Sequence, residues 1–216
     1  MLSTAPETRT VPRYVHVIDD DRDVRRSLSF MLGAGDFQSR PFASGEDLLD
    51  SLTQLRPGCI LLDVRMPEMD GFAVMDALAE RGVEWPVIVM TGHGEVSVAV
   101  RAMKAGAIDF LEKPFDEAQL LASLERGFEL LGDRREKADR KRSAGQRIAD
   151  LSIRESEVLR GLMAGLANKV LARRLNISLR TVEMHRANMM ARLGVGSLAE
   201  ALTLAVQAGL EPLEQE

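Results

Sequence analysis

The first 130 residues alternate between short apolar runs and longer segments whose apolar residues recur with helical spacing. Five strand-like runs and five helical segments in strict alternation predict a parallel sheet with right-handed crossovers and helices on both faces. The expected strands are 14–19, 37–42, 59–63, 86–91 and 109–112, and the expected helices are 24–32, 44–52, 72–82, 95–107 and 116–131.

The third expected strand is an unbroken apolar run that ends at a carboxylate, CILLD from Cys59 to Asp63. Such a run, bounded by turn residues, is typical of a central strand covered by helices on both faces. Asp63 then lies at the carboxyl end of a strand, where open α/β sheets place their ligands. A lone aspartate there is also explained by a strand end that faces water. Other residues are needed to distinguish a ligand site from a solvated strand end.

Polar residues stand at the ends of other expected strands as well, namely Asp19, Asp20, Asp21, Thr91, Lys113 and Pro114. In a parallel sheet these ends meet at one edge, so the side chains should converge around Asp63. Carboxylates about 4 Å apart repel by about 4 kcal/mol per pair at an effective dielectric near 20, and therefore need a cation. Their oxygens suit Mg2+, which readily bridges to phosphate. The metal, Lys113 and Thr91 could then stabilise a phosphoryl group on Asp63.

The charge distribution divides the chain into two parts. Residues 1–130 contain 13 Lys and Arg against 22 Asp and Glu, a net charge of −9, whereas residues 131–216 contain 15 against 11, a net charge of +4. Two domains with different partners are therefore expected. An acidic first half suits a cation, and a basic second half suits phosphates.

Composition disfavours several classes of protein. No apolar run approaches the roughly 18 residues of a membrane span, and the N-terminus lacks the apolar core of a secretory signal. Cys59 is the single cysteine and lies in an apolar run, which indicates core packing rather than nucleophilic chemistry. We therefore expect a cytoplasmic protein that does not associate with membranes.

Residues 131–147 form a charged segment without a large apolar side chain between Gly132 and Arg147, so it should be a linker. Pairs such as Glu136 with Arg140 could extend the preceding helix, but a flexible tether is equally compatible with the composition. The following stretch is helical throughout. Ser152 and Glu155 form a capping-box signature, Asn168 and Ser178 are expected helix caps, and the short LNIS turn joins two helices as in a helix-turn-helix.

The helix after Ser178 has one apolar stripe, formed by Val182, Met189 and Leu193, which should face a core. The opposite side is small and mixed, as in a helix that reads the major groove of DNA, although many surface helices carry arginines without binding DNA. Basic residues on these two helices could hold phosphates, and they are Lys169, Arg173, Arg174, Arg180, Arg186 and Arg192.

The strand-end residues of the first half occur in motifs that resemble a known family. DD, D-x-R-M-P-x-M-D-G, T-G and K-P, in this order over residues 12–130, are similar to the receiver domain of bacterial response regulators. The resemblance implies a flavodoxin-like doubly wound (βα)5 fold and phosphorylation of Asp63 by a sensor histidine kinase. It also implies a cis bond before Pro114 and no enzymatic activity beyond phosphotransfer to the domain itself and autodephosphorylation.

The same resemblance assigns roles around Asp63. Mg2+, or Mn2+, is expected on Asp19, Asp20, Asp63 and the main-chain carbonyl of Arg65. Lys113 should contact the phosphate, and Thr91 and Phe110 match the switch pair that reorients on phosphorylation. Arg65 and His93 stand where members of the family tune the lifetime of the phosphate.

The second half, over residues 148–210, resembles the LuxR-type helix-turn-helix, and the two halves together resemble the FixJ-like subfamily of response regulators. The matching segments are LSIRESEVL, GLANKVLARRLNIS, RTVEMHR and ARLGVGS. The resemblance implies promoter DNA, RNA polymerase and a phosphorylation-dependent homodimer as partners. Pairing is expected through the last helix, with Leu198, Ala201, Leu202 and Val206, and through Val96, Val98, Val100, Met103 and Lys104. The expected DNA contacts are Lys169, Arg173, Arg180, Thr181, Glu183, Met184, Arg186, Ala187 and Asn188.

Two other functions compete with a phosphorylation-controlled regulator. One is a constitutive DNA-binding protein whose receiver is only structural. The other is an aspartyl-phosphate phosphohydrolase, but those enzymes carry the nucleophile after the first strand and need a substrate cap, whereas Asp63 follows the third strand and no segment is left for a cap.

Overall fold

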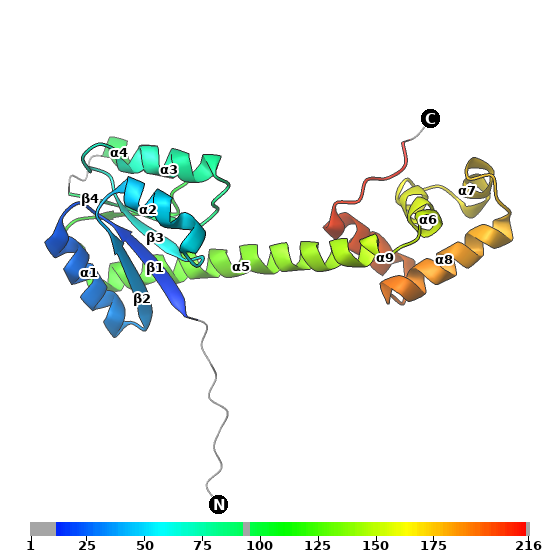
Figure 1. Cartoon of the computed structure of the whole chain (residues 1–216), viewed down its shortest axis with the longest axis horizontal. Coiled ribbons are helices and arrows are strands. Elements are labelled where there is room, and N and C mark those ends of the chain that lie inside the picture. Colours follow the sequence, from blue (N-terminus) through cyan, green and yellow to red (C-terminus); the bar gives the residue numbers. More distant parts are fainter. Residues whose placement is uncertain (1–11, 93–95, 215–216) are drawn as a thin grey trace, which may run out of the picture. The chain divides into compact units, whose positions relative to one another are not determined.

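The computed structural model describes residues 12–92 and 96–214. The chain divides into two compact units, the first ending at Asp133 and the second beginning at Arg134 (Figure 1). The first unit is an α/β domain and the second consists of helices. His93 and Glu95, which the sequence analysis placed in a site and in a helix, lie outside the described residues.

A five-stranded parallel sheet forms the centre of the first unit, with the strand order β2-β1-β3-β4-β5. All residues of β3 are buried, as the unbroken apolar run predicted. The doubly wound parallel sheet expected from the alternation is therefore confirmed. The strands are β1 (Arg13–Ile18), β2 (Phe37–Phe42), β3 (Cys59–Asp63), β4 (Val87–Thr91) and β5 (Asp109–Glu112).

Helices cover both faces of this sheet, and each face has its own apolar core. On one face, Leu28 and Leu32 of α1 and Leu120 and Leu124 of α5 pack together with strand residues. On the other face, side chains of α2, α3 and α4 do the same around Ile60. The helices are α1 (Arg22–Ala34), α2 (Gly45–Ser51), the 3-10 turn η1 (Leu52–Gln54), α3 (Gly71–Glu80), α4 (Val96–Lys104) and α5 (Glu117–Ala149).

Short polar side chains determine where several of these helices begin. Asp21, Ser44 and Asp70 precede α1, α2 and α3, and each accepts a hydrogen bond from backbone N–H groups of the first turn. These bonds satisfy donors that have no partner inside the helix. The carboxyl ends of the strands thereby connect to firmly anchored helix starts.

The charged segment that follows the α/β domain is helical, because α5 continues to Ala149. The predicted pair of Glu136 and Arg140 is present, with 2.6 Å between Oε2 and Nη2. Such exposed pairs stabilise a helix by only about 0.3–0.5 kcal/mol. Of the two conformations compatible with the composition, the helical extension is the one observed.

Four helices complete the second unit, together with the end of α5: α6 (Ile153–Met163), α7 (Asn168–Arg174), α8 (Leu179–Leu193) and α9 (Leu198–Ala208). The capping box of Ser152 and Glu155 and the cap at Ser178 are confirmed. The cap expected at Asn168 is wrong: Ala167 is the N-cap of α7, without a side-chain bond, and Asn168 is the first helical residue. Among the described residues no single helix could span a membrane, and only α8 and α9, bent by 66°, satisfy a length and composition test as a pair.

The segment after α9 folds back over the helix-turn-helix and closes its core. Leu213 packs against the cluster of Val158, Leu171, Ala172 and Val182, and its N–H donates to the carbonyl of Arg160 over 3.1 Å. The Arg160 guanidinium in turn donates to the carbonyl of Glu211, and that of Arg174 to the carbonyl of Glu214. This C-terminal strap, residues 210–214, is therefore part of the fold of the second unit.

Removal of the Leu213 side chain should destabilise the second unit. We expect Leu213→Ala to lower its free energy of unfolding by about 1–2 kcal/mol, below the range for a fully buried leucine because this side chain is only partly buried. Urea denaturation followed by circular dichroism measures the change, with the exposed Pro212→Ala as the control. Equal midpoints for both variants would show that the strap does not contribute.

Candidate functional site

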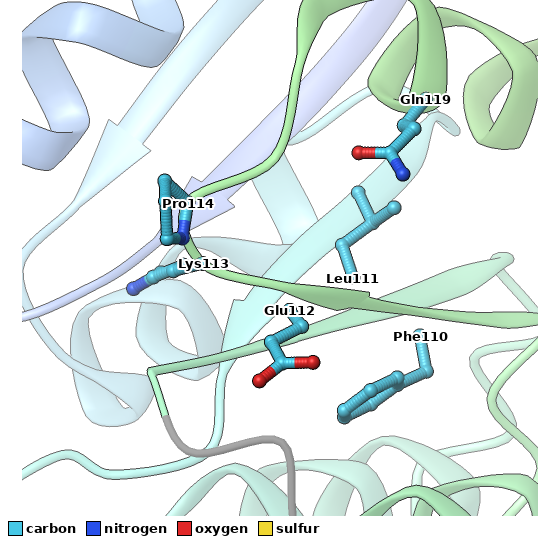
Figure 2. Close-up of a pocket in the computed structure, with 6 residues that line it drawn as sticks. All are labelled: Phe110, Leu111, Glu112, Lys113, Pro114 and Gln119. Atoms are coloured by element: carbon cyan, nitrogen blue, oxygen red, sulfur yellow. The ribbon is translucent and has the colours of Figure 1, made fainter.

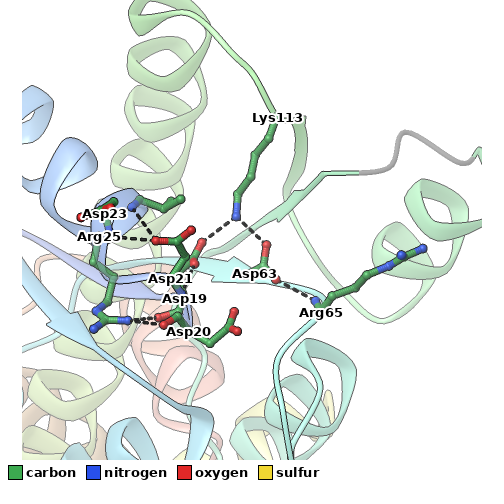
Figure 3. Close-up of polar contacts among 9 residues, drawn as sticks. Asp19, Asp20, Asp21, Asp23, Arg25, Asp63, Arg65 and Lys113 are labelled. Atoms are coloured by element: carbon green, nitrogen blue, oxygen red, sulfur yellow. Dashed lines mark hydrogen bonds and ion pairs between the residues drawn. The ribbon is translucent and has the colours of Figure 1, made fainter.

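The carboxyl edge of the sheet gathers four polar residues from four strands. Asp19 follows β1, Asp63 ends β3 and Lys113 follows β5 (Figure 3). Thr91 ends β4. Asp19, Asp63 and Thr91 are buried, with 1%, 6% and 1% of their surface exposed. The backbone N–H of Lys113 donates to the carbonyl of Thr91 over 2.7 Å, which fixes the last two strand ends to each other.

Lys113 links the two buried carboxylates. Its ammonium lies 2.6 Å from Asp19 Oδ2 and 2.6 Å from Asp63 Oδ1. Burial opposes the charge of Lys113, but the hydrogen bonds to Asp19 and Asp63 outweigh it and raise the pKa of the lysine. Burial raises the pKa of Asp19, and the nearby ammonium lowers it only in part. Two carboxyl groups thus share one ammonium, so the group has more acidic than basic side chains.

The loop after β3 wraps closely around Asp63. The second carboxylate oxygen, Oδ2, accepts a hydrogen bond from the backbone N–H of Arg65 over 2.8 Å. Gly71 donates its N–H to the carbonyl of Val64, and a Cβ at position 71 would lie 2.5 Å from the carbonyl oxygen of Asp63. Any other residue at position 71 would push this loop away. The glycine at the end of the motif is therefore required by the close approach, while the aspartate before it caps α3.

The oxygen donors expected for a metal lie at this edge, but their side chains do not converge on a common position for an ion. Among residues 12–92 and 96–214, no group of three or more His, Cys, Asp or Glu side chains is arranged to hold an ion. Asp19 and Asp63 instead converge on Lys113, and Asp20 is exposed beside them. Carboxylates and the Arg65 carbonyl are hard ligands, and the group has excess negative charge, so the donor set fits Mg2+ or Mn2+.

The expected switch residues lie on β4, which neighbours β3, and on β5, which neighbours β4. Thr91 is buried at the end of β4, and Phe110 in β5 is half-buried. Phe110 lines a hollow of about 390 Å³, and Figure 2 shows its ring and the Lys113 ammonium at different ends of that hollow. The other lining residues are Leu111, Glu112, Pro114 and Gln119. The bond between Lys113 and Pro114 is cis, as the family resemblance implied.

Of the two residues expected to tune phosphate lifetime, only Arg65 lies within the described residues. The Arg65 side chain is exposed, and Figure 3 shows its guanidinium extending away from Asp63. His93 lies outside the described residues. The sequence analysis did not single out Arg25 of α1. Its guanidinium donates to the carbonyls of Asp19 and Asp20, in the acidic loop from Asp19 to Asp21 that follows β1.

The expected DNA-binding residues lie on α7 and α8 of the second unit. Val182, Met189 and Leu193 are buried, so the predicted core stripe of α8 is correct. Thr181 is half-buried and its hydroxyl is bonded to Ser178, and Arg186 is also half-buried. The remaining expected contacts are exposed, and they are Lys169, Arg173, Arg180, Glu183, Met184, Ala187 and Asn188.

Two arginines that could have held phosphates are engaged inside the second unit. The Arg192 guanidinium pairs with the buried Glu155 over 3.2 Å and donates to the carbonyl of Asp150, while Arg174 binds the C-terminal strap. Burial opposes the charge of Glu155, but bonds from Ser152 and the charge of Arg192 leave its pKa lowered. The sequence analysis did not foresee this pair. The capping-box glutamate, Glu155, was a possible signal, because a buried carboxylate needs a cationic partner.

The expected pairing surfaces are only partly exposed. On α9, Ala201 is fully buried in the core of its own unit, which excludes it from a contact between two modules. Val206 is 69% exposed, and Leu198 and Leu202 are half-buried. On α4, Val98 packs against the core, whereas Val100, Met103 and Lys104 are exposed.

Comparisons with known proteins agree with this two-unit architecture. Residues 15–125 match the family described as "Response regulator receiver domain" and residues 149–205 the family "Bacterial regulatory proteins, luxR family". The transcriptional regulatory protein FixJ of Azorhizobium caulinodans is 46% identical over 200 residues, which cover 93% of this chain and 95% of that protein.

Two solved structures extend the likeness. The response regulator StyR is 37% identical, with a TM-score of 0.78 over 91% of this chain and all of that chain. Full-length FixJ from B. japonicum is 41% identical, with a TM-score of 0.58 over 93% of this chain and 99% of that chain. A receiver domain joined to a LuxR-type domain defines a two-component response regulator that acts in transcription. Within that class, the chain belongs to the FixJ-like family. This domain make-up implies a histidine kinase and DNA as partners.

Lys113→Ala should destabilise the receiver because it leaves two buried carboxylates without their shared ammonium. We expect the free energy of unfolding at neutral pH to fall by about 3–5 kcal/mol in EDTA, the usual cost of breaking a buried ion pair. The loss should be smaller in MgCl2, because the cation replaces part of the missing charge. Urea denaturation measures both, with the exposed Lys104→Ala as the control. A loss no greater than that of the control would contradict the role of Lys113.

Proposed function

We propose that a sensor histidine kinase phosphorylates Asp63 and that this phosphorylation controls DNA binding by the second unit. The observation that carries the proposal is the convergence of Asp19, Asp63 and Lys113 at the carboxyl edge of the sheet, with Lys113 bonded to both carboxylates. A buried, net negative group beside a reactive carboxylate is suited to bind a divalent cation and then the oxygens of a phosphoryl group.

Each residue has a defined part in the transfer. A carboxylate oxygen of Asp63 forms a bond to phosphorus while the bond from phosphorus to the kinase histidine breaks, and the imidazole nitrogen leaves with the electron pair. Mg2+ or Mn2+ on Asp19, Asp20, Asp63 and the Arg65 carbonyl would supply charge neutralisation when bound. Lys113 moves its ammonium from Asp63 to the phosphoryl oxygens, and Thr91 donates its hydroxyl to them. The receiver acts on no substrate other than its own aspartyl phosphate.

The switch follows from the position of Thr91 and Phe110. When Thr91 turns toward the phosphoryl group, it leaves space on the side of β4 that Phe110 can fill from the neighbouring strand. The exposed surface of α4 and β5, with Val100, Met103 and Lys104, then changes and pairs with a second receiver. Shifting such an equilibrium from about 1:99 to 99:1 requires roughly 5.5 kcal/mol. A bound phosphoryl group and a new dimer interface together can supply that energy.

Dimerisation brings two copies of α8 to one DNA duplex. Two recognition helices about 34 Å apart fit successive major-groove faces of a pseudo-palindromic promoter. The exposed Arg180, Glu183, Met184, Ala187 and Asn188 then face the bases. Lys169 and Arg173 hold phosphates, and Thr181 and Arg186 contact the backbone from the edge of the helix. RNA polymerase is the partner through which a promoter-bound regulator acts.

Arg65 sets the lifetime of the phosphate in this proposal, because its side chain begins next to Asp63 and can swing over the path of an attacking water. His93 is proposed for the same role. Unchanged dephosphorylation rates in Arg65→Ala and His93→Ala would reject both assignments.

The oligomeric state separates a phosphorylation-controlled regulator from a constitutive DNA binder. We expect beryllofluoride with Mg2+, which mimics the phosphoryl group, to convert the wild-type protein from monomer to dimer and to tighten operator binding. Asp63→Asn should do neither, while the exposed Asp76→Asn on α3 should behave like wild type. Gel filtration and operator binding measure the response. An unchanged oligomeric state and affinity in wild type would favour the constitutive binder.

Phosphate contacts on α7 can be tested through salt dependence. Lys169→Ala should weaken binding to all DNA sequences by a similar factor and reduce the slope of log K against log salt by about 1, because one contact to phosphate is lost. Fluorescence anisotropy with operator and random DNA at several salt concentrations measures the slope. The control is Lys141→Ala, which removes an exposed charge from α5. Equal slopes for the two variants would place Lys169 away from the DNA.

A further inference from the structure

Arg25 contacts the acidic loop although neither the phosphotransfer nor the switch uses it. It lies in α1, half-buried, and its Nη1 donates to the carbonyl of Asp19 over 2.6 Å and to that of Asp20 over 2.9 Å (Figure 3). One guanidinium nitrogen thus bridges two successive peptide carbonyls. These carbonyls belong to the two residues whose carboxylates are proposed to hold the divalent cation.

The loop from Asp19 to Asp21 is held at several points, and Arg25 holds a part that the others do not reach. Asp19 Oδ1 accepts from the N–H of Asp21 over 2.9 Å, and Lys113 binds Oδ2. Asp21 in turn caps α1 through the N–H groups of Asp23 and Val24. The carboxylate of Asp20 is exposed, so its direction depends on the backbone that carries it. Arg25 fixes that backbone from the carbonyl side.

The charge of Arg25 adds to this geometric effect. A guanidinium remains protonated at every accessible pH and presents its donors in a rigid plane. It therefore counteracts the repulsion among the carboxylates of the loop. Because Arg25 binds carbonyls and not carboxylates, it leaves the carboxylate oxygens available for a cation.

We propose that Arg25 is a positioning residue for the divalent cation: it orients the backbone of Asp19 and Asp20 so that their carboxylates meet the ion together. This proposal rests on the proposed function, because it concerns the same site. Arg25 touches neither the ion nor the phosphoryl group. Its effect is therefore on affinity for the cation and not on the chemical step once the cation is bound.

The test is titration of the full-length protein with MgCl2 in a calorimeter, without a phosphodonor. We expect Arg25→Ala to weaken Mg2+ binding by about 10-fold or more, the usual effect of removing a residue that orients metal ligands. Arg26→Ala is the matched control, because it removes the same charge from an exposed position on the same helix. It should bind Mg2+ as wild type does, and Arg25→Lys, which retains a donor and a charge, should lie between.

Phosphorylation by acetyl phosphate gives a second, independent measurement. In Arg25→Ala the Mg2+ concentration for half-maximal rate should rise by a similar factor, while the rate at saturating Mg2+ should remain near that of wild type. A variant that only loosens the fold would instead lower the melting temperature in EDTA and leave Mg2+ affinity unchanged, and this result would overturn the proposal. If Arg25→Ala does not fold, the affinity of Arg25→Lys decides in the same way.

Two further outcomes distinguish the sources of failure. Equal losses of affinity in Arg25→Ala and Arg26→Ala would show a diffuse charge effect and overturn the positioning role, with the proposed function intact. No Mg2+ binding by the wild-type protein would overturn the metal site of the proposed function and this inference together.

Discussion

The receiver depends on one electrostatic constraint: carboxylates at the ends of fully buried strands must be paired. Asp63 ends a strand without exposed residues, and Asp19 follows the neighbouring strand. Removing such groups from water costs several kcal/mol for each ion unless an opposite charge and hydrogen bonds compensate. Lys113 reaches both carboxylates from the loop after β5, and this is possible because the parallel sheet brings all strand ends to one edge. The carboxylates that are costly to bury are thus the ones proposed to bind a cation and a phosphoryl group.

The second unit meets an analogous constraint with different residues. Glu155 is buried at the start of α6, where it closes a capping box and pairs with Arg192 at the end of α8. This pair and the C-terminal strap hold α6, α7 and α8 together from within. Consequently the exposed residues of α8 are not needed to hold the helices together and are available for the proposed contact with DNA. In the second unit the proposed DNA contacts are thus separate from the residues that stabilise the fold, whereas in the receiver Lys113 and its carboxylate partners serve both purposes.

The sequence was sufficient for the sheet, the strand ends and most helix caps, because these depend on local periodicity and on short polar side chains. It also predicted which face of α8 is buried. The expectations that proved wrong or incomplete concern helix starts and side-chain partners, which depend on tertiary packing. Asn168 is a good capping residue, but the chain enters α7 one residue earlier, at Ala167. Ala201, expected on a pairing surface, is buried in its own unit. The pairing of Arg192 with Glu155 was also not foreseen. Arg25 was overlooked because its partners are backbone carbonyls, which leave no pattern in a sequence.

The most direct test is the intact mass of the folded protein after incubation with acetyl phosphate and MgCl2. If the carboxylate edge functions as proposed, wild-type protein gains the mass of one phosphoryl group and Asp63→Asn gains none. A wild-type mass that remains unchanged, or an equal gain in Asp63→Asn, would contradict the assignment of Asp63 as phosphoacceptor.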